Sequence, residues 1–223
     1  VYTMFKLIIQ NIVTIFIPSV LKVKILNLMG HSISNKAKIG SVILGSNTKL
    51  NLQNGAIIGA FNLLSCQSLT LKSNAFIRRF NTFQGGFSVE LNEGASVGNF
   101  NRFVNSATSF EGFISNFYLG KFSNLTSKHY FDMTANITIC DNSVIGGIGS
   151  QFWTHGFQHF NLGKDRLRVD GAIFIGNGVY IGSRSLLSPG VILGDEVSIG
   201  AGAIVSKSLN TKKLYVSQPL RSI

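Results

Sequence analysis

The stretch IGNGVYIGSRSLLSPGVILGDEVSIGAGAIVSKSL, residues 175 to 209, repeats every six residues and decides the fold. Each of six successive hexads opens with an aliphatic residue that Gly or Ser follows: Ile175, Ile181, Leu187, Leu193, Ile199 and Val205. A period of six matches neither the turn of a helix, about 3.6 residues, nor the simple alternation of a flat strand. It predicts short strands with a corner in every hexad. Three hexads then make one triangular coil of about 18 residues, and the coils stack about 4.8 Å apart.

The same rule extends toward the N-terminus with more variation. Repeat units begin at Ile33, Leu52, Leu71 and Leu91, which are 19, 19 and 20 residues apart. Three units share a Phe-Asn pair, at residues 61–62, 80–81 and 100–101. Stacking would align these side chains in ladders that satisfy the polar groups and fill the prism. We therefore expect an all-β parallel β-helix over residues 31–210, with a helical segment before it (1–30) and a tail after it (211–223).

The first thirty residues differ from the repeats. The chain is almost wholly apolar from Leu7 to Leu21, but Pro18 interrupts this run, which falls short of the roughly 20 apolar residues of a membrane span. One interpretation is a helix that caps the first coil. The other is a kinked helix that lies on the inner membrane surface, with Lys6, Lys22 and Lys24 available for phosphates.

Composition limits the partners and the location. The 223 residues include 20 basic and nine acidic ones, and the net charge of +11 indicates an anionic partner such as a nucleotide phosphate, a lipid surface or nucleic acid. No basic helix interleaved with stacking aromatics is present, so we expect no nucleic-acid partner. Cys66 and Cys140 occur without a secretory cleavage pattern. This predicts reduced thiols and a cytoplasmic location, with the inner membrane face as a variant of it.

Residues 137 to 221 resemble the C-terminal part of the hexapeptide-repeat acyltransferases. Val179–Ser183 (VYIGS) resembles the family's Val-Trp-Ile-Gly-Ser/Ala segment, and Gly200–Lys207 (GAGAIVSK) resembles its Gly-Ala-Gly-Ser-Ile-Val-Thr-Lys run. Tyr215 to Arg221 is similar to the closing segment, although Leu220 stands where the family prefers a small residue. The resemblance implies a left-handed β-helix, the use of acetyl-CoA and a homotrimer with active sites between subunits.

The matched motifs also imply a cofactor site. Short side chains at Ser183, Ala201 and Ser206 would line the groove for the pantetheine arm of acetyl-CoA. Lys207 and Arg221 would meet the nucleotide phosphates, and simple solvation is the alternative for the lysine. Outside these motifs, Asn124 resembles an asparagine that orients the acceptor in sugar acetyltransferases.

The hexad pattern breaks between Ile145 and Ile181, which predicts an inserted loop at about residues 150–171. The family carries its general base in a Thr-His segment after such a coil, and this makes His155 the candidate. An imidazole can accept a hydroxyl proton near neutral pH, after which the sugar oxygen attacks the thioester. Trp153 and His159, in the same loop, are candidate contacts to the acceptor. The alternative is a structural His155 packed beside Trp153.

Two further histidine assignments remain open. His129 is the second candidate for the base, or a contact to the acceptor. Histidine-bearing β-helices also occur in the related carbonic anhydrases, which bind zinc between subunits. A zinc site needs about three well-placed ligands. The ligand spacing of that family is absent here, so we expect no metal.

A surface with few charges and many Asn and aromatic residues suits a carbohydrate. The sequence therefore predicts transfer of an acetyl group to a sugar hydroxyl of a bacterial surface polysaccharide, such as an O-antigen, or of its precursor. N-acylation of a nucleotide-linked amino sugar is one alternative. A solenoid that binds glycan without catalysis is another.

Overall fold

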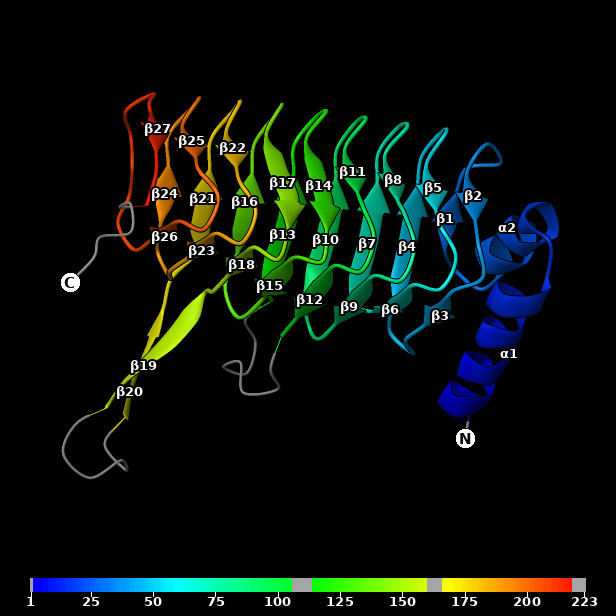
Figure 1. The fold of residues 1–223 in the computed structure, drawn as a ribbon. Helices are drawn as coiled ribbons and strands as arrows, with labels where there is room; N and C mark the ends of the chain where they lie inside the picture. The colour runs from blue at the N-terminus through cyan, green and yellow to red at the C-terminus, as the bar shows by residue number, and fades with distance from the viewer. Residues whose placement is uncertain (1, 106–113, 160–165, 218–223) are drawn as a thin grey trace.

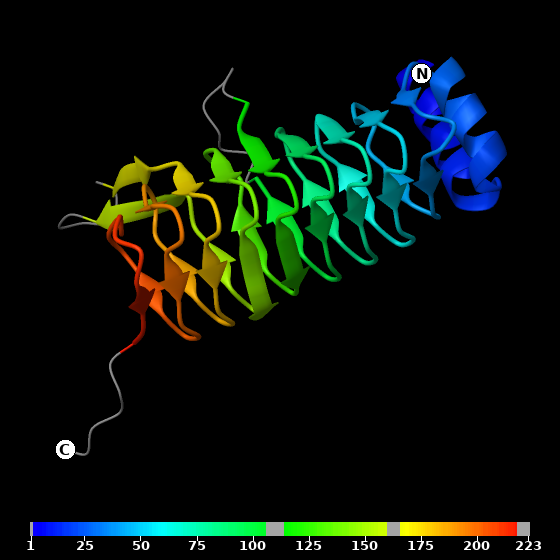
Figure 2. The same ribbon diagram turned by 90° about the horizontal axis from the view of Figure 1, so that it is seen from above.

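The computed structural model describes residues 2–105, 114–159 and 166–217. Two helices, α1 (Tyr2–Phe16) and α2 (Ser19–Leu28), precede a left-handed solenoid of short parallel strands with about eight turns. The helices cover one end of the solenoid and the C-terminal coils form the other (Figures 1 and 2). The predicted fold class, a left-handed parallel β-helix with an N-terminal helical segment, is confirmed.

The strands form three parallel sheets, which are the sides of the prism. Sheet A contains, in spatial order, β1 (Ser32–Ile33), β4 (Lys49–Leu52), β7 (Ser68–Leu71), β10 (Ser88–Leu91), β13 (Asn116–Leu119), β16 (Ile137–Ile139), β21 (Ile173–Ile175) and β24 (Ile192–Leu193). Sheet B contains β2 (Lys38–Ile39), β5 (Ile57–Ile58), β8 (Phe76–Ile77), β11 (Ser96–Val97), β14 (Asn124–Ser127), β17 (Val144–Ile148), β22 (Tyr180–Ile181), β25 (Ser198–Ile199) and β27 (Leu214–Tyr215). Sheet C contains β3 (Ile43–Leu44), β6 (Leu63–Ser65), β9 (Thr82–Gln84), β12 (Arg102–Val104), β15 (Tyr130–Asp132), β18 (Gln151–Phe152), β23 (Leu186–Leu187) and β26 (Ile204–Val205).

The six-residue period corresponds to one side of the prism and one corner. All six aliphatic side chains that define the period are buried, and they pack in register with those of the adjacent coils, as in the pairing of Ile181 with Ile145 and Ile199. Glycine permits the close stacking at a corner. A Cβ atom on Gly182 would lie 2.7 Å from the backbone nitrogen of Ala201 in the next coil.

A column of phenylalanine rings fills the middle of the prism along sheet C. Phe83, Phe103, Phe131 and Phe152 are fully buried, and successive ring centroids lie 4.5, 4.5 and 4.6 Å apart in nearly parallel planes. The register of the sheet sets this spacing, because each ring occupies the same position on its strand. These four rings give part of the chain's phenylalanine content, which is 18 residues, a structural role.

The asparagine ladder expected from the sequence lies at the corner between sheets B and C, named the BC corner. The side-chain amides of Asn81 and Asn101 each donate to the side-chain oxygen of the preceding rung, over 3.0 and 3.1 Å. The neighbouring Phe61, Phe80 and Phe100 also form a ladder, with centroids 5.1 and 4.9 Å apart. Their expected position inside the prism was wrong. Each has a positive φ near 60°, which turns the side chain outward and leaves it 45 to 61% exposed.

The N-terminal helices supply hydrogen bonds to the first coil, whose strand edges would otherwise be unpaired. The Asn11 amide accepts the Leu44 N–H at 2.9 Å and donates to the Leu44 carbonyl at 3.0 Å, which covers β3. Asn27 makes the same pair of bonds to Ile33 of β1, each of 2.8 Å. These contacts agree with the interpretation of the N-terminal segment as a cap on the first coil.

Lys22 completes the cap over β2. Its ammonium group donates to the carbonyl oxygens of Ile39 and Gly40, over 3.2 and 2.7 Å, and the residue is only 2% exposed. Burial lowers the pKa of the Lys22 ammonium group. This lysine is therefore engaged in the fold and is not available to a phosphate.

We expect Asn11→Ala to open the capped edge of the solenoid. The substitution leaves two buried backbone groups of Leu44 without partners, at a cost of about 1–3 kcal/mol. Hydrogen exchange of the Leu44 amide should become at least about tenfold faster, because a loss of about 1.4 kcal/mol in local stability is tenfold in the opening equilibrium. Asn210→Ala, an exposed change at the opposite end, is the control. Unchanged protection of Leu44 in Asn11→Ala would contradict the capping role.

The solenoid is interrupted within the region that the sequence predicted, but the chain leaves the prism later than the expected residue 150. Gln151 and Phe152 still belong to sheet C, so the chain leaves the prism only after Thr154. It then forms an antiparallel hairpin of β19 (His155–His159) and β20 (Arg166–Asp170) that projects from the body (Figure 1). In the segment expected to be a tail, β27 adds a strand to sheet B beside β25.

Candidate active site

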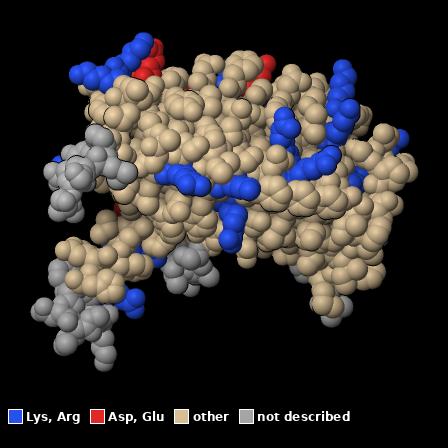
Figure 3. All heavy atoms as spheres, in the orientation of Figure 1, with Lys and Arg blue, Asp and Glu red and all other residues tan. Residues whose placement is uncertain are grey.

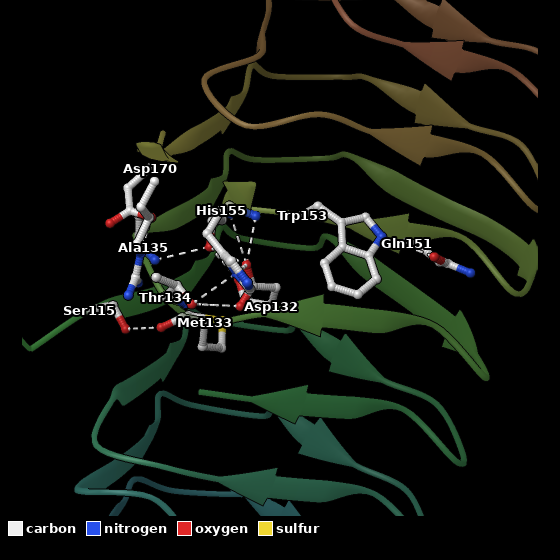
Figure 4. Close-up of polar contacts among 11 residues, drawn as sticks. Ser115, Asp132, Met133, Thr134, Ala135, Gln151, Trp153, His155 and Asp170 are labelled. Carbon is white, nitrogen blue, oxygen red and sulfur yellow. Dashed lines mark hydrogen bonds and ion pairs between the residues drawn. The ribbon is translucent and has the colours of Figure 1, made fainter. Parts of the chain in front are cut away.

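His155 is the first residue of the projecting hairpin, at the corner between sheets C and A, named the CA corner. The Gly171 N–H donates to the Thr154 carbonyl over 2.8 Å and closes the base of the hairpin where the chain returns to the prism. His155 therefore lies where β18 of sheet C leads into the hairpin. Figure 4 shows its ring above the Asp132 carboxylate of the preceding coil.

His155 and Asp132 form a tight pair. The distance from His155 Nδ1 to Asp132 Oδ2 is 2.6 Å, and the two side chains are 22% and 2% exposed. The His155 backbone N–H also donates to Oδ2, over 3.0 Å. One carboxylate oxygen thus orients both the backbone and the ring of the histidine, and the ring edge remains accessible to solvent.

Other donors hold the Asp132 carboxylate in its charged form. Oδ2 accepts from the backbone N–H and the hydroxyl of Thr154, each at 2.9 Å, and Oδ1 accepts from the Thr134 hydroxyl at 2.8 Å. Burial raises the pKa of the Asp132 carboxyl group, but hydrogen bonds from Thr134, His155 and Thr154 outweigh it and lower the pKa below its usual value. Asp132 is therefore a buried anion with many donors around it.

This arrangement determines the tautomer of His155. A buried carboxylate can only accept, so Nδ1 carries the proton and donates to Asp132. In the neutral ring the other nitrogen, Nε2, then has a free lone pair that can accept a proton. Once Nε2 is protonated, the Asp132 charge stabilises the imidazolium ion. The pair has the geometry of a general base with an orienting carboxylate.

Aromatic rings flank the imidazole and shape its surroundings. The Trp153 and Phe157 rings approach it edge-on, with centroids 6.3 and 5.9 Å from that of His155. Trp153 also packs on Tyr130 at 5.0 Å and donates from its indole nitrogen to Gln151 Oε1 over 2.9 Å. Trp153 therefore lies beside the candidate base, as Figure 4 shows. Its predicted contact with an acceptor is compatible with this position.

His129 occupies a different environment. It is 1% exposed and continues the asparagine ladder at the BC corner, where its N–H donates to Asn101 Oδ1 over 2.9 Å. Its Nδ1 accepts the Ser150 N–H at 3.1 Å, and its Nε2 lies 2.9 Å from the Thr126 hydroxyl. Both ring nitrogens have partners within the protein. The structure therefore favours a structural role for His129 over the predicted role as base or acceptor contact.

We expect His129 to make the fold sensitive to acid. Burial lowers the pKa of His129 to about 4, whereas an unfolded histidine titrates near 6.5. As the pH falls, the unfolded chain gains this proton first, so the stabilisation is complete above about pH 6.5 and is lost as the pH approaches 4. The loss can amount to about 3 kcal/mol.

His129→Asn, which continues the ladder with a group that does not titrate, should remove the part of this dependence that His129 causes. His31, whose pKa burial also lowers to about 4, should retain its own part. The measurement is the free energy of urea unfolding at several pH values between 4 and 7. His159→Asn is the matched control, because His159 is exposed. The same pH dependence in His129→Asn and wild type would show that His129 is not responsible.

His159 and Asn124 do not join His155 in one chain. His159 is the last residue of β19, four residues from His155 and thus about 13 Å along an extended strand, and it faces solvent opposite Arg166. Asn124 is an exposed residue of β14 in sheet B, the side of the prism opposite the CA corner. The sequence-based assignment of both residues to the acceptor site remains a prediction.

The predicted cofactor residues divide between two corners. Ser183 and Ala201 follow β22 and β25 at the BC corner, and the Gly202 N–H donates to the Ser183 carbonyl between these turns over 2.8 Å. Ser206 and Lys207 follow β26 at the CA corner, two coils beyond the Trp153–Thr154 turn. Both are exposed, and they line a hollow of about 250 Å³ at the C-terminal end. Arg221 lies outside the described residues.

The sequence analysis did not identify Asp132, which lies three residues after the candidate His129. Asp132 and His155 are 23 residues apart, and only the stacking of β15 on β18 brings them together. One signal was present. Asp132 is an acidic residue at the end of a strand, in a chain with nine acidic residues. In the described part of the chain, no three His, Cys, Asp or Glu side chains gather in a metal-binding group.

The fold and the candidate site indicate a hexapeptide-repeat acyltransferase, and comparisons with known proteins support this class. A family model described as bacterial transferase hexapeptide (six repeats) matches residues 172–207. These are the coils that contain the six-residue period. The resemblance to the hexapeptide-repeat acyltransferases is confirmed over this part of the chain.

Individual relatives can be named. The galactoside O-acetyltransferase of Escherichia coli (strain K12) is 34% identical over 111 residues, which are 49% of this chain and 54% of that protein. The chain thus matches about half the length of this curated relative. Among solved structures, a maltose O-acetyltransferase from Clostridium difficile 630 is similar with a TM-score of 0.46 and 25% identity, over 58% of this chain and 65% of that one. An N-acyltransferase from Bacillus cereus in complex with dTDP and coenzyme A has a TM-score of 0.41 and 16% identity, over 90% and 87% of the two chains.

Proposed function

We propose that this protein transfers an acetyl group from acetyl-CoA to a hydroxyl group of a sugar. The observation that carries the proposal is the His155–Asp132 pair, a partly exposed imidazole whose tautomer a buried carboxylate determines. The relative from Escherichia coli, named for O-acetylation of galactosides, supports the same chemistry.

The reaction needs one proton acceptor and no covalent enzyme intermediate. His155 Nε2 removes the hydroxyl proton as the sugar oxygen forms a bond to the thioester carbonyl carbon. The carbon–sulfur bond then breaks, and the imidazolium returns the proton to the leaving sulfur, so that the products are the acetyl ester and the CoA thiol. Asp132 keeps Nδ1 protonated throughout and stabilises the positive ring, because its carboxylate is held 2.6 Å away.

The placement of the cofactor residues supports an assembly of more than one chain, which by the family resemblance is a homotrimer. A ligand that contacts Ser183 and Ala201 at the BC corner and also Ser206 and Lys207 at the CA corner must cross sheet C or lie between two chains. Asn124, on the side of the prism opposite the CA corner, can approach His155 only from a second copy. Sedimentation equilibrium should give three chains per particle. A monomer with full activity would contradict the assembly.

A hollow along the CA corner supports an acceptor of several sugar units. A cavity of about 770 Å³ is lined mainly by small and amide side chains of the first four coils, including Asn47, Gln67, Gln84 and Asn105. Asn105 lies two coils before Thr154 and His155, which is about 10 Å along the axis of the solenoid. Uncharged amides that both donate and accept suit sugar hydroxyls. We therefore propose that the acceptor is a bacterial surface polysaccharide or its precursor. The acetylation would take place in the cytoplasm, where acetyl-CoA is made.

The test is an acetyl-transfer assay with the purified protein, acetyl-CoA and oligosaccharide fractions of increasing length. We expect release of the CoA thiol and an acetyl mass increment on the sugar that mild alkali removes. An alkali-resistant increment would indicate an amide and therefore the N-acyltransferase alternative. Glycan binding without thiol release, and without affinity for acetyl-CoA, would contradict catalysis.

A further inference from the structure

The N-terminal helices present a second apolar face that the fold does not use. Their inner face contacts the first coil, where Val13, Val23 and Leu26 are almost fully buried. Ten large apolar side chains of the same two helices, between Met4 and Leu28, remain exposed. Phe16 and Leu28 are 75 and 89% exposed. Capping therefore explains one face of the helices and leaves the other without a partner among the described residues.

This face adjoins the most cationic part of the chain. Residues 1–89 contain nine Lys or Arg and no Asp or Glu, so they carry +9 of the net charge of +11. Lys6 and Lys24 are exposed on the helices themselves, and Lys36, Lys38 and Lys49 are exposed on the first coils. In Figure 3, which has the orientation of Figure 1, the surface toward the helices shows blue side chains and no red ones.

We propose that these two helices dock the protein on the surface of an anionic lipid bilayer. Apolar side chains of this size enter the boundary between headgroups and acyl chains, and each nearby lysine adds about 1 kcal/mol of attraction to an anionic leaflet. End-to-end docking of a second copy on this face fits poorly, because two N-terminal ends of charge +9 would then meet and repel each other. No described helix is long and apolar enough to span a membrane.

The geometry sets the height of the candidate active site above the lipid. α1 lies across the end of the solenoid (Figures 1 and 2), so a bilayer that meets its outer face meets the prism end-on. Strand β18, which leads to His155, is five steps beyond β3 in sheet C, or about 24 Å along the axis. A docked molecule would hold His155 above the headgroups, at the level of the sugar units of a lipid-linked glycan.

The test is co-sedimentation of the full chain with vesicles, measured without acetyl-CoA or sugar, so its result does not depend on the transferase proposal. We expect binding to vesicles that contain phosphatidylglycerol, at least about tenfold stronger than to phosphatidylcholine alone and weakened by salt. The triple variant Phe5→Ser, Ile12→Ser, Phe16→Ser should lose at least about tenfold of this affinity, because all three side chains are 50 to 75% exposed.

A matched triple variant at the other end, Phe174→Ser, Ile192→Ser, Leu214→Ser, should bind as wild type does. The charge reversal Lys6→Glu, Lys24→Glu should weaken binding without removing any apolar group, which keeps the test valid if the apolar variant folds poorly. Equal binding to neutral and anionic vesicles, or wild-type binding by the N-terminal triple variant, would overturn the proposal. Absence of vesicle binding, with self-association that the same variant abolishes, would instead assign the face to a second copy.

Discussion

His155→Ala is expected to lower the kcat of acetyl transfer by about 10²- to 10⁴-fold, the usual cost of removing a general base. The affinity for acetyl-CoA should change little, because the four described cofactor residues do not contact His155. The fall in kcat follows because, without Nε2, the sugar hydroxyl must lose its proton to water as it attacks. Steady-state kinetics of thiol release and direct titration with acetyl-CoA measure the two quantities separately.

Asp132→Asn should produce a similar fall in kcat for a different reason. The amide would donate toward Nδ1, so the ring would carry its proton on Nε2 and lose the free lone pair. Gln158→Ala, on the same hairpin but exposed and outside the predicted site, is the matched control and should retain activity. A larger loss in His129→Asn than in His155→Ala would transfer the role of base to His129. A melting curve of each variant excludes unfolding as the cause.

Phe103→Ala is expected to destabilise the fold by about 3–5 kcal/mol, the largest effect on stability predicted here. The Phe103 ring is fully buried between the rings of Phe83 and Phe131, 4.5 Å from each, and meets the edge of Phe117 at 4.8 Å. Its removal leaves a cavity between rigid strands, which cannot close without breaking the sheet register. Urea unfolding measures the loss.

Phe100→Ala, three residues earlier, is the matched control. Phe100 also stacks on a phenylalanine, at 4.9 Å from Phe80, but it is 50% exposed, so its loss should cost much less. Equal destabilisation by the two variants would contradict the assignment of the inner column as the core.

The two ladders show where sequence analysis of this chain reaches its limit. The repeat spacing predicted that Phe80 and Asn81 would each stack with their equivalents, and both ladders form. The direction of the Phe80 side chain did not follow from the spacing. It depends on a positive φ at the corner, a backbone detail that the pattern of residue types does not show, because such corners usually take Gly or Asn.

The candidate active site likewise contains residues that the sequence predicted and one that it did not. His155 was named from a Thr-His segment that resembles the family's, and Trp153 from its place in the same loop; the structure puts both at the CA corner. Asp132 could not be named, because its relation to His155 depends on how many residues the coil between them contains. His129 had the residue type of a base, and only its burial and its bonded ring nitrogens showed the structural role.

The sequence by itself determined the six-residue period, the three-sided coil, the break in the repeat between Ile145 and Ile181, and the N-terminal cap as one of two alternatives. These features are local, since each depends on residue types at fixed spacing along the chain. The tertiary structure alone decided which residues of different coils meet: Asp132 under His155, His129 in the asparagine ladder, and Asn11 and Lys22 on the first strand edges. The physical reason is stacking, because parallel strands bring together residues whose distance along the chain varies with every insertion in a coil.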